Sequence, residues 1–402
     1  MIYLDNAATT KIDPVVLEAM MPYLTGEYGN PGSIYPLGNR ASTAVHNARK
    51  QVARMMGADE SNIIFTSSGT EANNLAFNSC LHYGVENNRD IILISAVEHS
   101  SVVNFAEFLH IKYGFYIIKI AVNPDGTIDF NDLVAKLERF HKRIALVSIM
   151  MVNNELGSIN NAYRISQECS ERGILTHFDC VQAAGNIDIN VGVLNCDFAS
   201  VSSHKIHGPK GVGALFVKDR STVTPLIHGG SNQEFGLRGG TQNVAGIVGF
   251  GEACRLAGLY HSGKDSVTLS MKRKFIEELK KEFESKDLLN LLFFNAGSDF
   301  NHSKVLSVRL VGIDAETMVI ALGANGVCVS AGSACRSLEQ EPSNVLRAVG
   351  LSDDEARDTL RVSFSRMNTY EEVERAAGII AETALFIYNN TVHTERRPYG
   401  ET

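Results

Sequence analysis

The sequence predicts an α/β protein with a mostly parallel, seven-stranded sheet in a large domain, followed by a smaller α+β domain. Between about residues 62 and 217, short apolar runs alternate with amphipathic stretches of helical length. This alternation is typical of a parallel sheet that helices cover on both faces. After about residue 254 the pattern changes to a long amphipathic helix and an alternating strand. A length of 402 residues also favours two domains.

In the first part of the chain, each strand except the last three is followed by a helix. The expected strands cover residues 62–68, 90–96, 115–122, 143–152, 174–180, 197–203 and 211–217. The expected helices cover residues 69–84, 101–114, 131–141 and 162–173. Ligands of such sheets bind at the carboxyl ends of the strands. Residues that directly follow these strands are therefore the first candidates for a site.

In the second part of the chain, glutamates and lysines mark the outer face of a helix expected at residues 266–286. A strand at 304–312, a helix at 314–326 and an apolar run from residue 327 follow. The polar residues 388–402 are expected to be loosely held. We therefore place the large domain at residues 15–254, and we build the small domain from residues 1–14 and 255–402.

Composition excludes several classes of protein. The net charge is −8 and no long basic block occurs, which argues against direct nucleic-acid binding. No apolar run is long enough to span a membrane, and the first residues lack the pattern of a secretion signal. The seven cysteines form no CxxC pair. This favours a reducing compartment, hence the cytoplasm, with most cysteines buried as small hydrophobes.

The segment TSSGTEANN, residues 66–74, lies between a predicted strand and a predicted helix. Small residues there leave backbone N–H groups at a helix N-terminus free to bind a phosphate. The alternative is that Ser68 or Thr70 simply caps the helix.

Three further polar residues follow predicted strands. Asp179 ends an apolar strand, where an acid needs a cationic or hydrogen-bonding partner or serves as a cap of the next helix. His99 follows another strand, where a histidine with no function is the simpler interpretation. Asn154 follows a fourth strand, in a position where asparagines usually form turns.

Lys205 stands in the segment SSHKIHGPKG, residues 202–211, at the end of the predicted strand 197–203. It is either a solvated lysine or one that forms a Schiff base, and Lys210 is a nearby alternative amine. His204 and His207 lack an accompanying carboxylate or thiol, so we expect no metal site. A phosphate cradle, a stacking ring, an acid and a lysine at one edge of a sheet are what pyridoxal 5′-phosphate requires.

Four segments now support a resemblance to a known family: YLDNAATT (3–10), HKIHGPKGVGAL (204–215), RGGTQNV (238–244) and SAGSACRS (330–337). In this order they are very specific, and the match covers nearly the whole chain. The sequence resembles the class V, fold-type I pyridoxal-phosphate enzymes, and among them the cysteine desulfurases of the NifS/IscS kind. The resemblance implies a fold-type I transferase architecture and a homodimer with L-cysteine as substrate.

The resemblance also implies roles for individual residues. Lys205 would hold the cofactor aldehyde, and His99 would stack on the ring and move protons. The other implied cofactor contacts are Asp179 with the ring nitrogen, Gln182 with the ring hydroxyl, Gly69, Thr70, Ser202 and His204 with the phosphate, and Thr241 with the phosphate of the neighbouring subunit. Asn154 and Arg361 would hold the substrate carboxylate, which suits the two-pronged arginine fork. Cys180 is a departure, because the family usually has a small apolar residue there.

Cys335 lies in a loop rich in serine, glycine and alanine, which suits a mobile, exposed sulfur carrier. Alone it would be an ordinary free cysteine; the resemblance implies that it takes the sulfur of L-cysteine as a persulfide and passes it to an acceptor protein. Cys328 is expected to be buried in a strand. The sequence leaves open selenocysteine lyase activity, or a sulfur-donor component that is slow until its partner docks. It does not choose among iron–sulfur cluster assembly, tRNA thiolation and DNA phosphorothioation.

Overall fold

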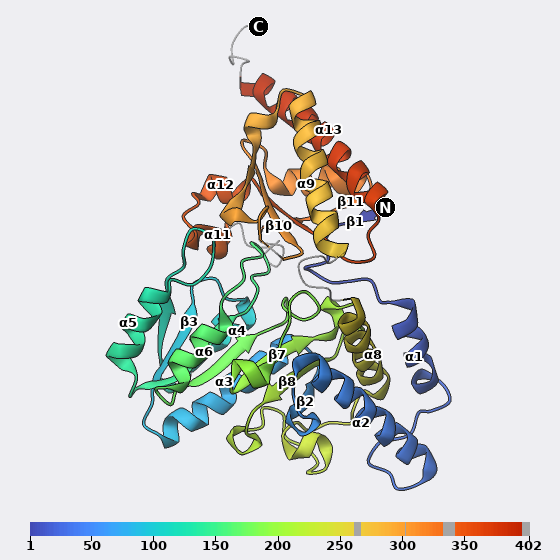
Figure 1. Cartoon of the computed structure of the whole chain (residues 1–402), viewed down its shortest axis with the longest axis vertical. Helices are drawn as coiled ribbons and strands as arrows, with labels where there is room; N and C mark the ends of the chain where they lie inside the picture. The colour runs from blue at the N-terminus through green and yellow to red at the C-terminus, as the bar shows by residue number, and fades with distance from the viewer. Residues whose placement is uncertain (261–266, 302, 333–341, 396–402) are drawn as a thin grey trace, which may run out of the picture.

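A computed structural model describes residues 1–260, 267–301, 303–332 and 342–395, with side chains up to residue 390 (Figure 1). Within these residues the large sheet has seven strands in the order β2-β8-β7-β6-β5-β3-β4. The strands are β2 (Ile63–Thr66), β3 (Ile91–Ser95), β4 (Tyr116–Ile120), β5 (Ile144–Met150), β6 (Leu175–Asp179), β7 (Phe198–Ser202) and β8 (Gly213–Val217). The five strands from β7 to β4 are parallel, and β8 runs antiparallel to both β7 and β2. The predicted mostly parallel sheet is therefore confirmed.

Helices cover both faces of this sheet, so its strands are buried except at the edge strand β4 and at Leu175, the half-buried first residue of β6. One face packs against α1 (Pro14–Leu24), α2 (Pro36–Met56), α5 (Phe130–Phe140), α6 (Ala162–Ser170), α7 (Val191–Leu194) and α8 (Val244–Tyr260). The other face packs against α3 (Gly69–Glu86) and α4 (Ser100–Tyr113). The helix ends follow local sequence rules: Pro36 opens α2, and Gly57 closes it in the left-handed conformation with φ of 63°.

A second, smaller sheet has the antiparallel order β12-β13-β10-β9. Its strands are β9 (Leu292–Phe294), β10 (Val305–Leu310), β12 (Ser330–Ala331) and β13 (Thr359–Ser363). Beside it β1 (Ile2–Tyr3) pairs in parallel with β11 (Val327–Cys328). The accompanying helices are α9 (Val267–Ser285), α10 (Ala315–Ala324), α11 (Asn344–Ala348), α12 (Asp353–Arg357) and α13 (Tyr370–Glu395). This part has its own hydrophobic cluster and lies above the large sheet in Figure 1.

The end of the chain, from residue 388, was expected to be loosely held. The structure shows that residues 388–395 are helical and continue α13 to Glu395. The reason is cooperative: the buried face of α13, with Val373, Ile380 and Ala384, fixes the helix, and each further residue then adds one hydrogen bond. Residues 396–402 lie outside the described residues.

The N-terminal segment joins the two sheets. Its first residues form β1 beside the small sheet, and Ala7 N–H donates to Ser363 Oγ at 2.8 Å. Farther along, the N–H groups of Thr10 and Asp13 donate to the carbonyls of His204 and His207, both at 2.9 Å. Residues 7 and 8 therefore lie where the small sheet meets the end of β7. No helix in the described part of the chain combines the length and the apolar character needed to cross a membrane.

Candidate active site

A cavity of about 310 Å³ lies at the carboxyl ends of the strands of the large sheet. Parallel strands bring their following residues to one edge, as expected for this class of sheet. Ten residues singled out in the sequence line this cavity: Gly69, Thr70, His99, Asn154, Asp179, Gln182, Ser202, His204, Lys205 and Arg361. Ala7 and Ala8 from the N-terminal segment also line it.

Lys205 reaches this cavity from a 3-10 turn, Ser203–Lys205, that directly follows β7. Its Nζ donates to the carbonyls of Ala7 and Ala8 at 2.6 and 2.8 Å. The amine is half-buried and is held by two neutral acceptors. An amine in this setting is oriented and is a candidate for covalent attachment of a carbonyl compound.

Asp179, the last residue of β6, is buried and fully engaged by donors. Its Oδ1 accepts from Val181 N–H at 2.9 Å, and its Oδ2 accepts from Asn73 Nδ2 at 2.8 Å. Asn73 Nδ2 also donates to Ser101 Oγ at 2.9 Å. A carboxylate fixed by such hydrogen bonds is ready to pair with a protonated ring nitrogen.

His99 is the N-cap residue of α4, and Ser101 fixes its ring. Ser101 N–H donates to His99 Nδ1 at 3.1 Å. Since a backbone N–H can only donate, the proton of the neutral imidazole is on Nε2. Burial and the nearby Lys205 charge lower the pKa of His99, against the opposing effect of Asp179. The ring is therefore neutral at physiological pH, with a hydrogen-bonded lone pair on Nδ1 that can accept a proton and an N–H on Nε2 that can donate one.

The other end of the cavity has the features of an anion site. Ser68 caps α3, with its Oγ accepting from Glu71 N–H at 3.1 Å. The N–H groups of Gly69 and Thr70 belong to the first turn, which has no intrahelical acceptors. Ser202 Oγ is buried there without a partner in the described part of the chain. Desolvation, and then the charges of Lys205, Lys210 and Lys304, lower the pKa of His204 to about 4.

Gln182 contributes a second unpaired polar atom to the cavity. Its Nε2 donates to the Ala7 carbonyl at 2.8 Å, while its buried Oε1 has no partner among the described residues. A buried acceptor of this kind costs free energy unless a ligand donor meets it. The hydroxyl of a bound ring would supply that donor.

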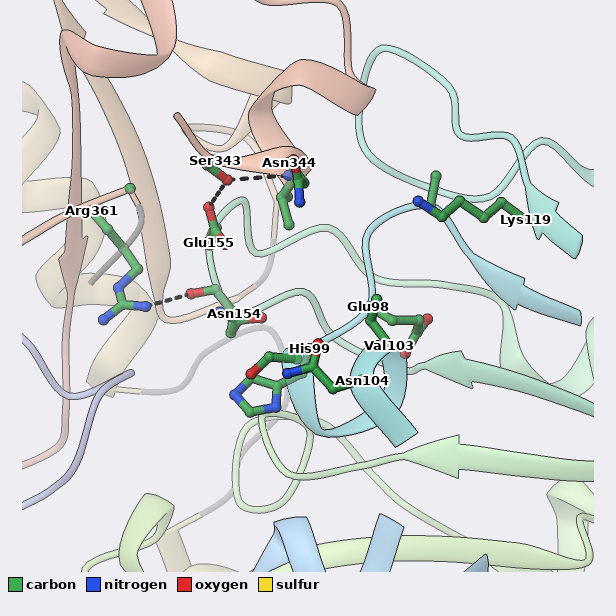
Figure 2. A pocket seen from close by; sticks show the side chains of 14 residues that line it. Glu98, His99, Val103, Asn104, Lys119, Asn154, Glu155, Ser343, Asn344 and Arg361 are labelled. Carbon is green, nitrogen blue, oxygen red and sulfur yellow. Dashed lines mark hydrogen bonds between the residues drawn. The ribbon is translucent and has the colours of Figure 1, made fainter. Parts of the chain in front are cut away.

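A smaller pocket of about 110 Å³ adjoins the cavity and shares His99, Asn154 and Arg361 with it (Figure 2). Arg361, in β13, donates from Nη1 to the Asn154 carbonyl at 3.2 Å and from Nη2 to Asp5 Oδ1 at 2.9 Å. Its buried Nε has no partner in the described residues. The guanidinium is thus anchored and keeps a donor for a carboxylate.

Glu98 also lines the smaller pocket, next to His99 in sequence. Its Oε1 accepts from Ser95 Oγ at 2.5 Å and from Met150 N–H at 2.8 Å. Burial raises the pKa of Glu98 to about 8, so this carboxyl is largely protonated at neutral pH. The pocket is also lined by Gly332 and Ser343, which flank in sequence the segment that contains Cys335.

One predicted site residue does not line the cavity, and another lies outside the described residues. Thr241 is exposed and lines a separate surface hollow, so it contributes nothing to the site of its own chain. Cys335 lies outside the described residues. Of the other cysteines, Cys180 is buried in the core and does not line the cavity. Cys328 is in β11 as expected but is only half-buried, because β11 pairs with the two-residue β1 at the edge of the small domain.

Sequence patterns did not single out several residues that shape the site. Asn73 and Ser101 connect Asp179 to His99, and Asp5 anchors Arg361. Lys304 is buried and donates to the Lys205 carbonyl at 3.1 Å. The one available indication was Asn73 in the segment TEANN (70–74), since this polar residue falls on the buried face of α3.

These features define a class of protein: an α/β enzyme whose cavity, at the carboxyl ends of the strands, combines a lysine, a carboxylate and a helix N-terminus suited to a phosphorylated cofactor. The family model for aminotransferase class-V matches residues 2–376. A protein named cysteine desulfurase from Nostoc sp. is 39% identical over 95% of this chain and 92% of its own length. A solved NifS-like protein has a TM-score of 0.86 and 32% identity, covering 96% of this chain and 99% of its own. A structure titled SspA in complex with cysteine has a TM-score of 0.76 and 31% identity, covering 90% and 99%.

The chain belongs to the aminotransferase class-V family and, within it, to the cysteine desulfurases of the NifS/IscS kind. The family and the fold class predicted from the sequence are both confirmed.

Proposed function

We propose that this protein is a pyridoxal-phosphate-dependent cysteine desulfurase that moves the sulfur of L-cysteine to Cys335. The observation that carries the proposal is the position of Lys205. Its amine enters a cavity lined by the carboxylate of Asp179 and by Gly69 and Thr70 in the first turn of α3, whose N–H groups suit an anion.

The residues present fit this cofactor. Three buried oxygens without partners among the described residues, Gln182 Oε1, Ser202 Oγ and Asn73 Oδ1, belong to cavity-lining residues. A ring hydroxyl would meet Gln182 and a phosphate would meet Ser202. Gly69, Thr70 and His204 would hold the phosphate, and Asp179 would pair with the ring nitrogen. When bound, the cofactor draws electron density from the substrate carbons.

The protein's own groups would bind and orient the substrate. Arg361 would meet the substrate carboxylate with the donor that Asp5 and Asn154 leave available. Asn154 lines both the cavity and the adjoining pocket, so it would contact the same carboxylate. Once its amine is free, Lys205 would take and return protons at the substrate, with neutral His99 as a second acceptor.

The sulfur transfer needs no reactant other than L-cysteine and the thiol of Cys335. The thiolate of Cys335 forms a bond to the sulfur of L-cysteine, and the carbon–sulfur bond of the substrate breaks. The products are L-alanine and a persulfide on Cys335, with the proton of the Cys335 thiol accounted for in the alanine. An acceptor protein then removes the outer sulfur atom. The pocket lined by Gly332 and Ser343, on either side of this segment in sequence, supports access of Cys335 to the substrate.

We further propose a cytoplasmic homodimer in which Thr241 of each chain reaches the phosphate in the other chain's site. The exposure of Thr241, away from its own cavity, supports this assignment. The division into a large domain of residues 15–254 and a small domain of 1–14 and 255–402 is supported by separate hydrophobic clusters, although Leu256 still packs with the large domain.

The test is an assay of the purified protein with L-cysteine and a reductant, which follows sulfide and alanine together with the visible spectrum. The proposal predicts an absorption band of lysine-bound cofactor and equal amounts of sulfide and alanine. Cys335→Ser should keep the band and lose sulfide release, whereas the control Cys328→Ser should keep both. A protein that takes up no pyridoxal phosphate, or a Cys335→Ser variant as active as wild type, would contradict the proposal.

A further inference from the structure

The first turn of α3 contains a charge that opposes its expected ligand. Glu71 directly follows the N–H groups of Gly69 and Thr70, which we assign to the cofactor phosphate. A carboxylate in the first turn stabilises a helix, but it repels a phosphate bound at the same end. Binding of a phosphate there therefore requires a positive group that compensates the charge of Glu71.

Arg238, from a distant part of the chain, is that positive group. Its Nε donates to Glu71 Oε1 at 2.8 Å and its Nη2 donates to Glu71 Oε2 at 3.2 Å. Ser67 N–H also donates to Oε2, at 2.8 Å. Burial alone would raise the pKa of Glu71, but these donors and the Arg238 charge hold it below its ordinary value. The carboxylate is thus ionised, belongs to the residue directly after Thr70, and is compensated by the Arg238 guanidinium.

The segment that carries Arg238 is held in place by a second ion pair. Glu234 Oε2 accepts from Arg49 Nη1 and from Phe65 N–H, both at 2.8 Å, and Oε1 accepts from Arg49 Nη2 at 2.8 Å. Glu234 and Phe235 have φ of 42° and 60°, which is unfavourable for residues with side chains. A buried, well-satisfied carboxylate keeps this strained segment against β2, so Arg238 is positioned rather than freely mobile.

We propose that Arg238 is a positioning residue for the cofactor phosphate: by pairing with Glu71 it cancels the negative charge beside the N–H cradle. The inference rests on the proposed function for the nature of the ligand. Its electrostatic part concerns any phosphate at this helix end, so it can be measured with inorganic phosphate as well as with the cofactor.

The experiment measures binding to the full-length protein, after removal of its cofactor, for wild type, Arg238→Gln, Arg238→Lys, Glu71→Gln and the double variant with both Gln substitutions. The probes are pyridoxal 5′-phosphate, pyridoxal without phosphate, and inorganic phosphate. Binding of inorganic phosphate is measured by the thermal stabilisation of the protein. Arg238→Gln should weaken binding of pyridoxal 5′-phosphate and of inorganic phosphate by about 5- to 30-fold, since it leaves the charge of Glu71 uncompensated at the helix end. Glu71→Gln and Arg238→Lys should stay within about threefold of wild type, and pyridoxal binding should not change.

The double variant separates charge compensation from a merely structural role. It should bind phosphate within about threefold of wild type, because both charges are gone. Arg143→Gln is the matched control, since Arg143 forms a similar two-pronged pair with Asp90 on the exposed surface. Equal phosphate affinity in wild type and Arg238→Gln, or an unrecovered double variant, would overturn the inference. Phosphate effects as expected without covalent uptake of the cofactor would instead overturn the proposed function alone.

Discussion

Asn73 Nδ2 lies 2.8 Å from Asp179 Oδ2 and 2.9 Å from Ser101 Oγ. One buried amide thus ties the carboxylate at the end of β6 to the residue that fixes the ring of His99. The group assigned to the ring nitrogen and the group assigned to the face of the cofactor ring are thereby held at a set distance before any ligand binds. Such preorganisation reduces the entropy lost when the ligand is bound.

Asn73→Ala should therefore weaken cofactor binding by about tenfold or more, because it removes a hydrogen bond to a charged group that is worth roughly 1.5–3 kcal/mol. Spectroscopic titration with pyridoxal phosphate measures this directly. Asn78→Ala is the control on the same helix, since Asn78 bonds to the carbonyls of Thr224 and Pro225. Similar cofactor affinities for the two variants would show that Asn73 has no special part in the site.

The sequence allowed the large sheet to be predicted because its strands are short, apolar and almost all buried on both faces, as in β5, where every residue is buried. Residues after these strands were correctly expected at one edge, since parallel strands end together. The antiparallel β8 was not predicted as such, because burial does not encode strand direction.

The missed residues depend on contacts between distant parts of the chain. Asp5 and Arg361 are 356 residues apart in sequence, and Glu71 and Arg238 are 167 apart. Single polar residues on helices and in terminal segments resemble ordinary surface positions until the tertiary structure brings them together. Asn73 illustrates this, because only packing against β6 makes it a partner of Asp179.

Lys205→Arg should abolish the visible band of the bound cofactor and lower desulfurase activity by about a thousandfold or more, because a guanidinium neither attaches the aldehyde nor accepts protons. Absorption spectra after incubation with pyridoxal phosphate and sulfide assays provide the measurement. Lys210→Met is the control, since Lys210 is exposed and should leave both unchanged. A coloured Lys205→Arg protein together with a colourless Lys210→Met protein would reverse the assignment of the anchor.

Arg361→Lys should raise the KM for L-cysteine by about tenfold or more with a smaller change in kcat, because a lysine cannot keep the contacts to Asp5, Ser330 and Asn154 and also face the substrate. Steady-state kinetics at saturating cofactor resolve the two constants. Arg357→Lys, on the exposed helix α12, is the control. A lowered kcat at unchanged KM would show that Arg361 does not act by binding the carboxylate.

His177 should make the protein sensitive to mild acid. Its ring is buried in β6 between Ser148 Oγ at 2.8 Å and Ser200 Oγ at 3.0 Å, and burial lowers its pKa to about 4 against the opposing charge of Asp179. The unfolded chain, with an ordinary histidine pKa of about 6.5, then binds more protons between those values. The stabilising contribution is complete above about pH 6.5, and roughly 2 kcal/mol of it is lost between pH 7.5 and 5.

Urea unfolding measures this loss of stability. The loss should be smaller in His177→Gln and unchanged in the exposed control His46→Gln. His204 and His207, whose pKa values are also lowered to about 4, titrate in every variant. An unchanged pH dependence in His177→Gln would therefore rule out the buried imidazole as its source.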